Sequence, residues 1–210
     1  MNTLVRLVSS LAAACAAFAL SANAAPKSFD FKDPKGVNNV TFSLDAPLES
    51  ITGSGNGISG TIAFDPANPG ATSGKIVLAT SSLTVGNAMM KDHLHGAGWL
   101  DVATHPEITF EAKQLANMKT TGDVTKADVT GTLTVRGVSK EVTVPVSFTY
   151  LPGKLGARVN KPDLKGDLLV VRADFVINRS DFGIKPGQMT DKVAEDIHLK
   201  LSIAGASSQG

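Results

Sequence analysis

Two histidines spaced two positions apart form the clearest metal-binding pattern in this sequence. His93 and His95 offer two imidazoles, and a transition metal would need a further ligand from His105, Asp92 or Asp101. Because no motif fixes that ligand, we expect no metal and no cofactor, and we interpret His93 as a hydrogen-bonding residue beneath a covering segment. A metal-binding or stress-related protein that uses His93 and His95 is kept as an alternative.

Charged residues interrupt the apolar stretch from Leu168 to Ile177 and follow it. Arg172 and Asp174 share one strand phase, so we expect them to face the interior as a pair, since pairing lowers the free-energy cost of burying charge. Alternatively, Arg172 or Arg179 binds the phosphate or carboxylate head group of a ligand, for which a guanidinium is well shaped. We also expect Arg179 to hold a covering loop, for example through Asp92.

The sequence has no motif typical of catalysis. It has no Gly-x-Ser-x-Gly nucleophile elbow, no His-Glu-x-x-His zinc helix and no phosphate-binding loop before a helix. We therefore predict a binding protein and not an enzyme. With 20 basic and 19 acidic residues, the overall charge gives no reason to expect a nucleic-acid partner.

The first 24 residues have the pattern of a secretory signal peptide. Arg6 precedes an apolar run from Leu7 to Leu20, and the small residues of Ala22-Asn23-Ala24 suit a signal peptidase. The run is shorter than the roughly 20 residues that a membrane-spanning helix needs. We expect cleavage near Ala24, no stable membrane span, and one periplasmic or secreted domain over residues 25–210.

Alternation of apolar and polar residues predicts eight β-strands. They are expected at residues 40–44, 61–64, 75–83, 107–112, 129–135, 141–150, 168–177 and 197–203. Long helical periodicity is absent, so the predicted fold class is all-β with antiparallel strands, either as two packed sheets or as one closed barrel, in which closure removes exposed strand edges. The interior of an eight-stranded barrel is either filled by side chains or holds one small ligand.

Glycine, proline and methionine mark the places where the strand pattern breaks. We expect loops at Gly53–Gly60 and Asp65–Gly74, a bulge or close approach at Gly131, and a local edge or bulge at Pro145. The segment Asn87–His105 is expected to form a short helix or turn that covers one end of the sheet.

Three segments carry a family resemblance. They are Ser81 to Phe110, which ends in Pro106-Glu107-Ile108-Thr109-Phe110; Gly131 to Lys140, which reads GTLTVRGVSK; and Asn178 to Gly183, which reads NRSDFG. In this order and spacing they resemble the YceI-like family. The resemblance implies a lipocalin-like eight-stranded barrel in the periplasm that binds long apolar molecules such as polyisoprenoids, isoprenoid-quinone-like lipids or fatty-acid derivatives.

The expected ligand is an apolar small molecule or lipid, held for transport, storage or stress response. A filled-core interaction module is a further alternative, and a two-fold homodimer stays open. The expected ligand contacts come from the strands and from the covering segment: Phe42, Leu44, Ile62, Phe64, Phe110, Phe148 and Phe175 in the wall, and Met89, Met90, Leu94 and Trp99 at the cover.

Overall fold

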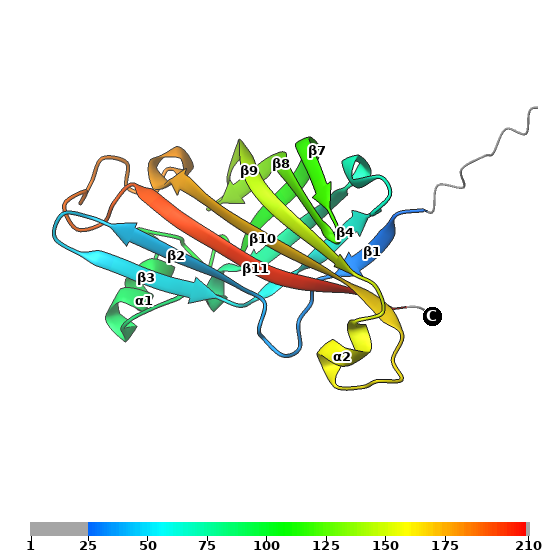
Figure 1. The fold of residues 1–210 in the computed structure, drawn as a ribbon. Coiled ribbons are helices and arrows are strands. Elements are labelled where there is room, and N and C mark those ends of the chain that lie inside the picture. Colours follow the sequence, from blue (N-terminus) through cyan, green and yellow to red (C-terminus); the bar gives the residue numbers. More distant parts are fainter. Residues whose placement is uncertain (1–24, 209–210) are drawn as a thin grey trace, which may run out of the picture.

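Antiparallel strands make up most of the computed structural model, which describes residues 25–208 (Figure 1). The strands are β1 (Lys27–Asp30), β2 (Asn39–Asp45), β3 (Ser50–Gly55), β4 (Ile58–Phe64), β5 (Ser73–Ala79), β6 (Thr84–Val85), β7 (Glu107–Thr121), β8 (Val124–Val135), β9 (Val138–Leu151), β10 (Gly166–Asn178) and β11 (Asp196–Ser208). The helices are α1 (Ala88–His95) and α2 (Leu155–Val159), with 3₁₀ turns at Pro69–Ala71, Thr80–Ser82 and Arg179–Phe182.

Eight of these strands close into a ring. Each pairs antiparallel with the next in the order β1-β4-β5-β7-β8-β9-β10-β11, and β11 returns to β1 where Ala206 pairs with Asp30. This arrangement confirms the predicted eight-stranded antiparallel barrel. The long strands β7 to β11 follow one another along the chain and pair in that order. Two-residue turns join β7 to β8 and β8 to β9, whereas longer segments with α2 and with the loop 183–195 join β9 to β10 and β10 to β11.

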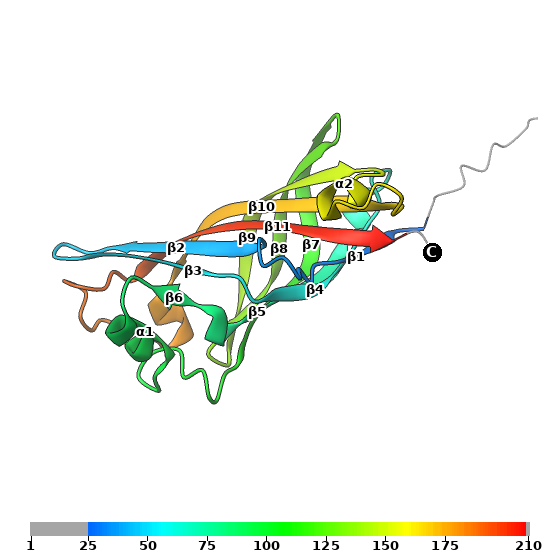
Figure 2. The same cartoon turned by 90° about the horizontal axis from the view of Figure 1, so that it is seen from below.

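The other three strands extend the sheet past the ring. β2 pairs with β11 between His198 and Ser202, β3 pairs with β2, and the two-residue strand β6 pairs with β3. The β2–β3 hairpin therefore projects beyond the barrel on the side where α1 lies (Figures 1 and 2). We call this side, with the hairpin, α1 and the loop 183–195, the open end, and the opposite side, with α2, the closed end.

Aromatic side chains fill the closed end. Phe64 stacks on Phe148 with ring centroids 5.6 Å apart, and Phe29 meets Tyr150 edge-on at 6.3 Å. Phe29, Phe64 and Phe148 are all buried, in one cluster with aliphatic residues of β7, β8, β10 and β11. Offset and edge-on packing of this kind stabilises a core beyond the burial of its apolar area.

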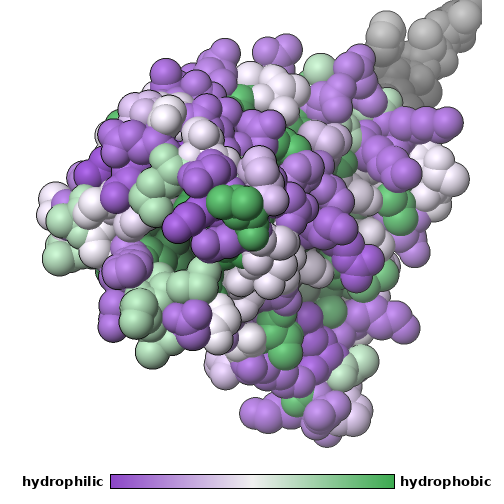
Figure 3. All heavy atoms as spheres, turned by 90° about the vertical axis from the view of Figure 1, so that its left-hand side faces the viewer, coloured by the Kyte–Doolittle hydropathy of each residue, from purple (hydrophilic) through white to green (hydrophobic). Residues whose placement is uncertain are grey.

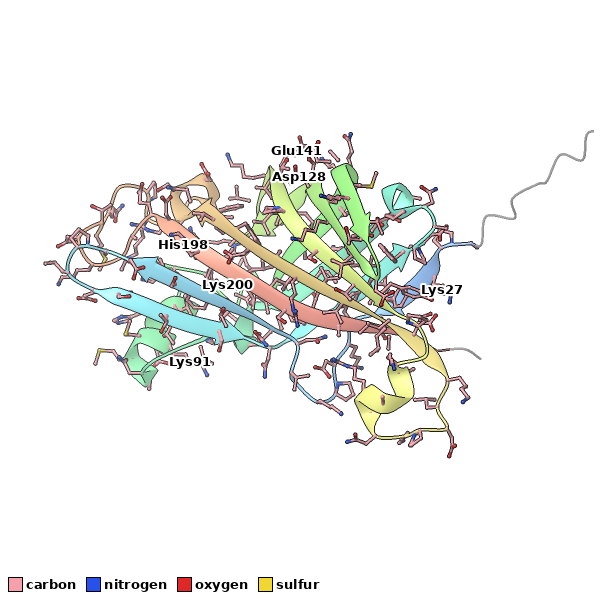
Figure 4. The ribbon with its side chains drawn as sticks, viewed as in Figure 1. Lys27, Lys91, Asp128, Glu141, His198 and Lys200 are labelled. Carbon is pink, nitrogen blue, oxygen red and sulfur yellow. The ribbon has the colours of Figure 1, made fainter. Side chains whose placement is uncertain are left out.

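A polar cluster fastens β1 to the barrel at the closed end. The Lys27 ammonium donates hydrogen bonds to the buried Asp167 carboxylate and to the Tyr150 hydroxyl, and that hydroxyl donates to Asp167 at 2.9 Å. Figure 4 shows the place of Lys27 on β1. The hydrogen bonds to Asp167 and Tyr150 raise the pKa of Lys27 to about 12. Burial opposes ionisation of Asp167, but hydrogen bonds from Lys27, the Gly153 N–H and Tyr150 outweigh it and hold the pKa of Asp167 below its ordinary value.

The structure corrects one predicted loop. Gly53–Gly60 was expected to be irregular, yet β3 runs to Gly55 and β4 begins at Ile58. The glycines serve close packing within the sheet: a Cβ atom at Gly53 would lie 2.2 Å from Cζ of Phe42. Glycine is therefore needed because the aromatic ring of the neighbouring strand lies over this position.

The expectations for Gly131, Pro145 and the covering segment are confirmed. A Cβ atom at Gly131 would lie 2.6 Å from Cζ of Phe110, beside a register shift in β7. The pairing of β9 with β10 stops at Val146, and Pro145 directly precedes that residue in the chain. The missing N–H of Pro145 therefore removes no hydrogen bond from the β9–β10 ladder. The short helix α1 follows Asn87, whose side-chain oxygen accepts the Met90 N–H at 2.9 Å.

No helix among residues 25–208 combines the length and the apolar character needed to cross a membrane. The predicted signal peptide, residues 1–24, lies outside the described residues.

Candidate ligand-binding cavity

An apolar cavity of about 600 Å³ lies in the open half of the barrel. Inward-facing residues of the strands form its wall, and residues of α1 and of the loop 183–195 complete the lining. Figure 2 shows α1 at the same end of the barrel as this loop. This volume is within the range of roughly 300–1,000 Å³ that is typical of small-molecule sites. Figure 3 views the open end, where apolar side chains reach the surface among hydrophilic ones.

Small inward side chains keep the centre of the barrel open. β7 contributes Ala112, β8 contributes Val129, β9 contributes Val146 and β10 contributes Ala173 to the wall. These four residues are shorter than the phenylalanines that fill the closed end. Because an eight-stranded barrel is just wide enough for side chains to fill, short side chains at one level leave a space for a ligand.

Most of the residues predicted for the wall and the cover line this cavity. The structure places these nine in the lining: Phe42, Leu44, Ile62, Phe110, Phe148 and Phe175 from the strands, and Met90, Leu94 and Trp99 from the covering segment. Their contact with a ligand stays a prediction. On α1, Met90, His93 and Leu94 line the cavity because helix positions three and four residues apart share one face.

Two predicted contact residues do not line the cavity. Phe64 is 1% exposed and belongs to the packed closed end, where it stacks on Phe148. Met89 is 70% exposed, because it precedes Met90 on α1 and so lies on another face of the helix. Phe64 therefore supports the base of the barrel, and Met89 lies on the outer surface of the open end.

Several wall residues were not anticipated from the sequence. Ile51 of β3 and Val85 of β6 line the cavity, as do Ile184, Met189 and Val193 of the loop 183–195. In β3 the inward positions that follow Ile51 are Gly53 and Gly55, so the apolar alternation that identifies a strand is missing. The loop has no periodicity at all, and only its run of Ile, Met and Val at irregular spacing hinted at a role in the wall.

The expected inward pair of Arg172 and Asp174 is wrong. Both residues are exposed on the outer face of β10, and Val171, Ala173 and Phe175 occupy the inward phase. Asp174 instead has an exposed ion pair across to Lys200 of β11, with Oδ2 and Nζ 3.6 Å apart (Figure 4). Neither residue can contribute to the cavity.

Arg179 is the buried cation of the open end, only 1% exposed. All five of its N–H donors are used, because Nε, Nη1 and Nη2 donate to backbone carbonyls of the loop 183–195. The accepting carbonyls belong to Ala194 (3.0 Å), Ile184 (2.7 Å), Lys185, Gln188 (2.6 Å) and Val193 (3.1 Å). The expected role in holding a loop is therefore found, but the partners are these carbonyls and not Asp92, and no donor is free for a head group.

Charged groups gather only at one part of the cavity wall. Besides Arg179, the charged lining residues are Lys185, Lys192 and Glu49. Lys185 Nζ lies 5.0 Å from the centroid of the Trp99 ring, and Arg179 Cζ lies 5.9 Å from it. Such contacts stabilise a cation over an aromatic face. The mouth thus combines an aromatic ring with cationic groups, whereas the deeper wall is apolar.

The histidines do not assemble a metal site in residues 25–208. No group of three His, Cys, Asp or Glu side chains with metal-binding geometry occurs there. His95 Nε2 donates a hydrogen bond to the Leu83 carbonyl at 2.8 Å and so links α1 to β6. The structural hydrogen bond that we expected of His93 is therefore made by His95, and His93 lines the cavity mouth.

Comparison with known sequences gives a consistent result. A family model described as the YceI-like domain matches residues 33–204. A UPF0312 protein of Pseudomonas putida is 34% identical over 160 residues, which is 76% of this chain and 75% of the relative. Another UPF0312 protein, from Pseudomonas paraeruginosa, is 31% identical over 150 residues and covers 71% of each chain.

Solved structures share the fold. The crystal structure of BcnA from Burkholderia cenocepacia superposes with a TM-score of 0.61 and 24% identity, over 79% of this chain and 95% of that one. A polyisoprenoid binding domain from Saccharophagus degradans, implicated in plant cell wall breakdown, gives a TM-score of 0.61 at 11% identity, over 88% and 99% of the two chains. At these identities the likeness concerns the fold.

Proposed function

Since the chain belongs to the YceI-like family, we propose that it is a non-enzymatic binding protein that holds one long apolar molecule in its barrel. The observation that carries this proposal is the apolar cavity of about 600 Å³, open at one end and closed by packed phenylalanines at the other. Transfer of apolar surface from water to such a site is favourable by roughly 25 cal/mol per Å². The cavity therefore suits an elongated hydrocarbon better than a polar substrate.

The ligand class that we propose is a polyisoprenoid, an isoprenoid-quinone-like lipid or a fatty-acid derivative. The Saccharophagus degradans domain that shares the fold is described as polyisoprenoid binding, which supports this class. The wall shape agrees with it, because branched aliphatic side chains of β5, β8 and β11 line one continuous space. We further propose that the protein acts in the periplasm, after removal of residues 1–24, in transport or storage of the ligand.

Native mass spectrometry of the mature protein from its own organism tests the proposal directly. We expect one apolar molecule per chain, which organic extraction and mass analysis then identify. The proposal would be contradicted by protein that is purified without a ligand and that binds no member of a lipid panel.

A variant that fills the cavity tests the site itself. Val146 points into the cavity from β9, so Val146→Trp occupies ligand space without burying a charge. Thr143→Trp is the matched control, since Thr143 is exposed on the same strand. We expect Val146→Trp to lower the affinity for a neutral fluorescent probe such as N-phenyl-1-naphthylamine at least tenfold, and Thr143→Trp to leave it unchanged. Equal affinities in two folded variants would place the ligand elsewhere.

A further inference from the structure

Resting on this proposed function, we propose that the ligand has an anionic head group, a phosphate or a carboxylate, which binds at the cavity mouth between Lys185 and Lys192. The site is the part of the wall formed by the loop 183–195 and Trp99. The apolar tail would then extend toward the closed end. This proposal narrows the ligand class from any long hydrocarbon to an amphiphile of defined charge.

The first observation is the imbalance of charge in the wall. Three cations, Arg179, Lys185 and Lys192, face one carboxylate, Glu49. Within residues 25–208, none of the three cations has a carboxylate oxygen within 4.0 Å, although four ion pairs occur elsewhere in the fold. Hydrogen bonds from Ser180 and Gly187, together with the charge of Arg179, lower the pKa of the neighbouring Glu195, so the surplus of positive charge rests on the two lysines. A surplus of cations beside an apolar cavity favours an anionic ligand.

The second observation concerns Arg179, which fixes where the lysines lie. Its side chain donates to the Lys185 carbonyl and to the Val193 carbonyl, next to Lys192. One buried guanidinium therefore holds both lysine-bearing segments against the cavity. Because all its donors are used, Arg179 acts as a positioning residue and as a fixed positive charge, and the head group would contact the lysines.

The third observation is the surroundings of Lys185. Its ammonium lies 5.0 Å from the centroid of the Trp99 ring, and Trp99 itself lines the cavity. The ring keeps the ammonium at the boundary between apolar wall and solvent, where charges attract each other more strongly than in bulk water. An ammonium also binds a phosphate or carboxylate oxygen through a short, charge-assisted hydrogen bond.

Two ligands with the same tail separate the head group from the hydrocarbon. Farnesyl phosphate and farnesol each compete with N-phenyl-1-naphthylamine for the purified, delipidated protein. We expect farnesyl phosphate to bind at least about tenfold more tightly, the effect of one charge-assisted hydrogen bond. The preference should shrink as salt is raised, since salt screens charge at the open mouth. Inorganic phosphate alone should not displace the probe.

Substitution of the lysines identifies the groups responsible. In Lys185→Gln/Lys192→Gln we expect the preference for farnesyl phosphate over farnesol to fall to about twofold or less, because the affinity for farnesyl phosphate falls much more than the affinity for farnesol. Lys91→Gln is the control, because Lys91 lies on α1 at the same end but does not line the cavity (Figure 4). It should keep the wild-type preference.

The outcomes distinguish this proposal from the proposed function. Equal affinities of the wild type for the two ligands would overturn the anionic head group and leave the lipid-binding function intact. A preference that survives in the double variant, or displacement of the probe by inorganic phosphate, would also overturn it. If neither farnesyl ligand binds and no lipid co-purifies, the proposed function itself fails.

Discussion

Replacement of Arg179 by glutamine should destabilise the protein and loosen the cavity mouth. Arg179 is 1% exposed and donates five hydrogen bonds to the loop 183–195. A glutamine is shorter and has two donors, so at least three carbonyls lose their partner. The loop then keeps the Glu195 carboxylate, which accepts the Gly187 N–H at 2.7 Å and the Ser180 hydroxyl at 2.6 Å, but it loses the hydrogen bonds that Arg179 donates to its carbonyls.

The magnitude follows from the burial and from the number of bonds. Hydrogen bonds that involve a charged group contribute about 1.5–3 kcal/mol each, but the five are not additive, because carbonyls of exposed residues such as Gln188 regain water. A buried acceptor left without its partner costs about 1–3 kcal/mol, so three such carbonyls that partly regain water amount to roughly 3–5 kcal/mol. We expect a loss in this range, which for a chain of this size lowers the Tm by roughly 10 °C.

Urea unfolding followed by circular dichroism measures this loss. Arg179→Lys should lose nearly as much as Arg179→Gln, because an ammonium keeps the charge but cannot reach five carbonyls arranged around a planar guanidinium. Arg172→Gln is the matched control, since Arg172 lies exposed on the outer face of β10, and it should change the free energy of unfolding by less than about 0.5 kcal/mol.

A loss below about 1 kcal/mol for Arg179→Gln would refute this reasoning, since it would mean that the loop is held without the guanidinium. Full stability in Arg179→Lys would show that charge alone matters and that the geometry of the bonds does not.

Two further predictions concern pH and packing. The Lys27–Asp167 cluster stabilises the fold fully between pH 3.8, the ordinary pKa of Asp167, and pH 10.5, the ordinary pKa of Lys27. This stabilisation is lost as the pH rises toward the Lys27 pKa of about 12, and as the pH falls through the lowered pKa of Asp167. Lys27→Met should flatten the alkaline limb of a Tm-against-pH curve, and an unchanged limb would contradict the assignment. Gly53→Ala should destabilise by about 1–3 kcal/mol in urea unfolding, because the new Cβ would lie 2.2 Å from Phe42 Cζ and 2.4 Å from the Thr84 carbonyl oxygen; a neutral result would show that the hairpin shifts freely.

The strands with regular alternation could be predicted from the sequence, and the exceptions have identifiable causes. In β9, Val142 to Phe148 alternate with polar residues, and the observed strand and its inward face agree with the pattern. In β3 the inward positions after Ile51 are glycines, so no apolar pattern remains to be detected. In β10 both phases carry apolar residues except for Arg172 and Asp174, and the sequence could not show which phase faces inward.

The residues of the candidate site could also be predicted from the sequence only in part. Aromatic residues such as Phe42 and Phe110 were predicted for the wall because their strand phase is unambiguous, and the cavity lining includes them. Phe64 has the same phase and the same residue type but lies at the packed end. Periodicity gives the face on which a side chain lies, whereas its level along the barrel axis depends on the register between strands.

The sequence by itself determined the all-β class and the apolar character of the interior, because side chains alternate between the two faces of a strand with a period of two. Only the tertiary structure decided that β1 and β2 both pair with β11 and that β1 completes the ring. It also decided that Arg179 donates hydrogen bonds to five carbonyls of one loop. These features depend on pairing between residues far apart in the chain, for which a local pattern contains no information. The open cavity also depends on the tertiary structure, since its space is the volume that side chains from ten strands leave unfilled.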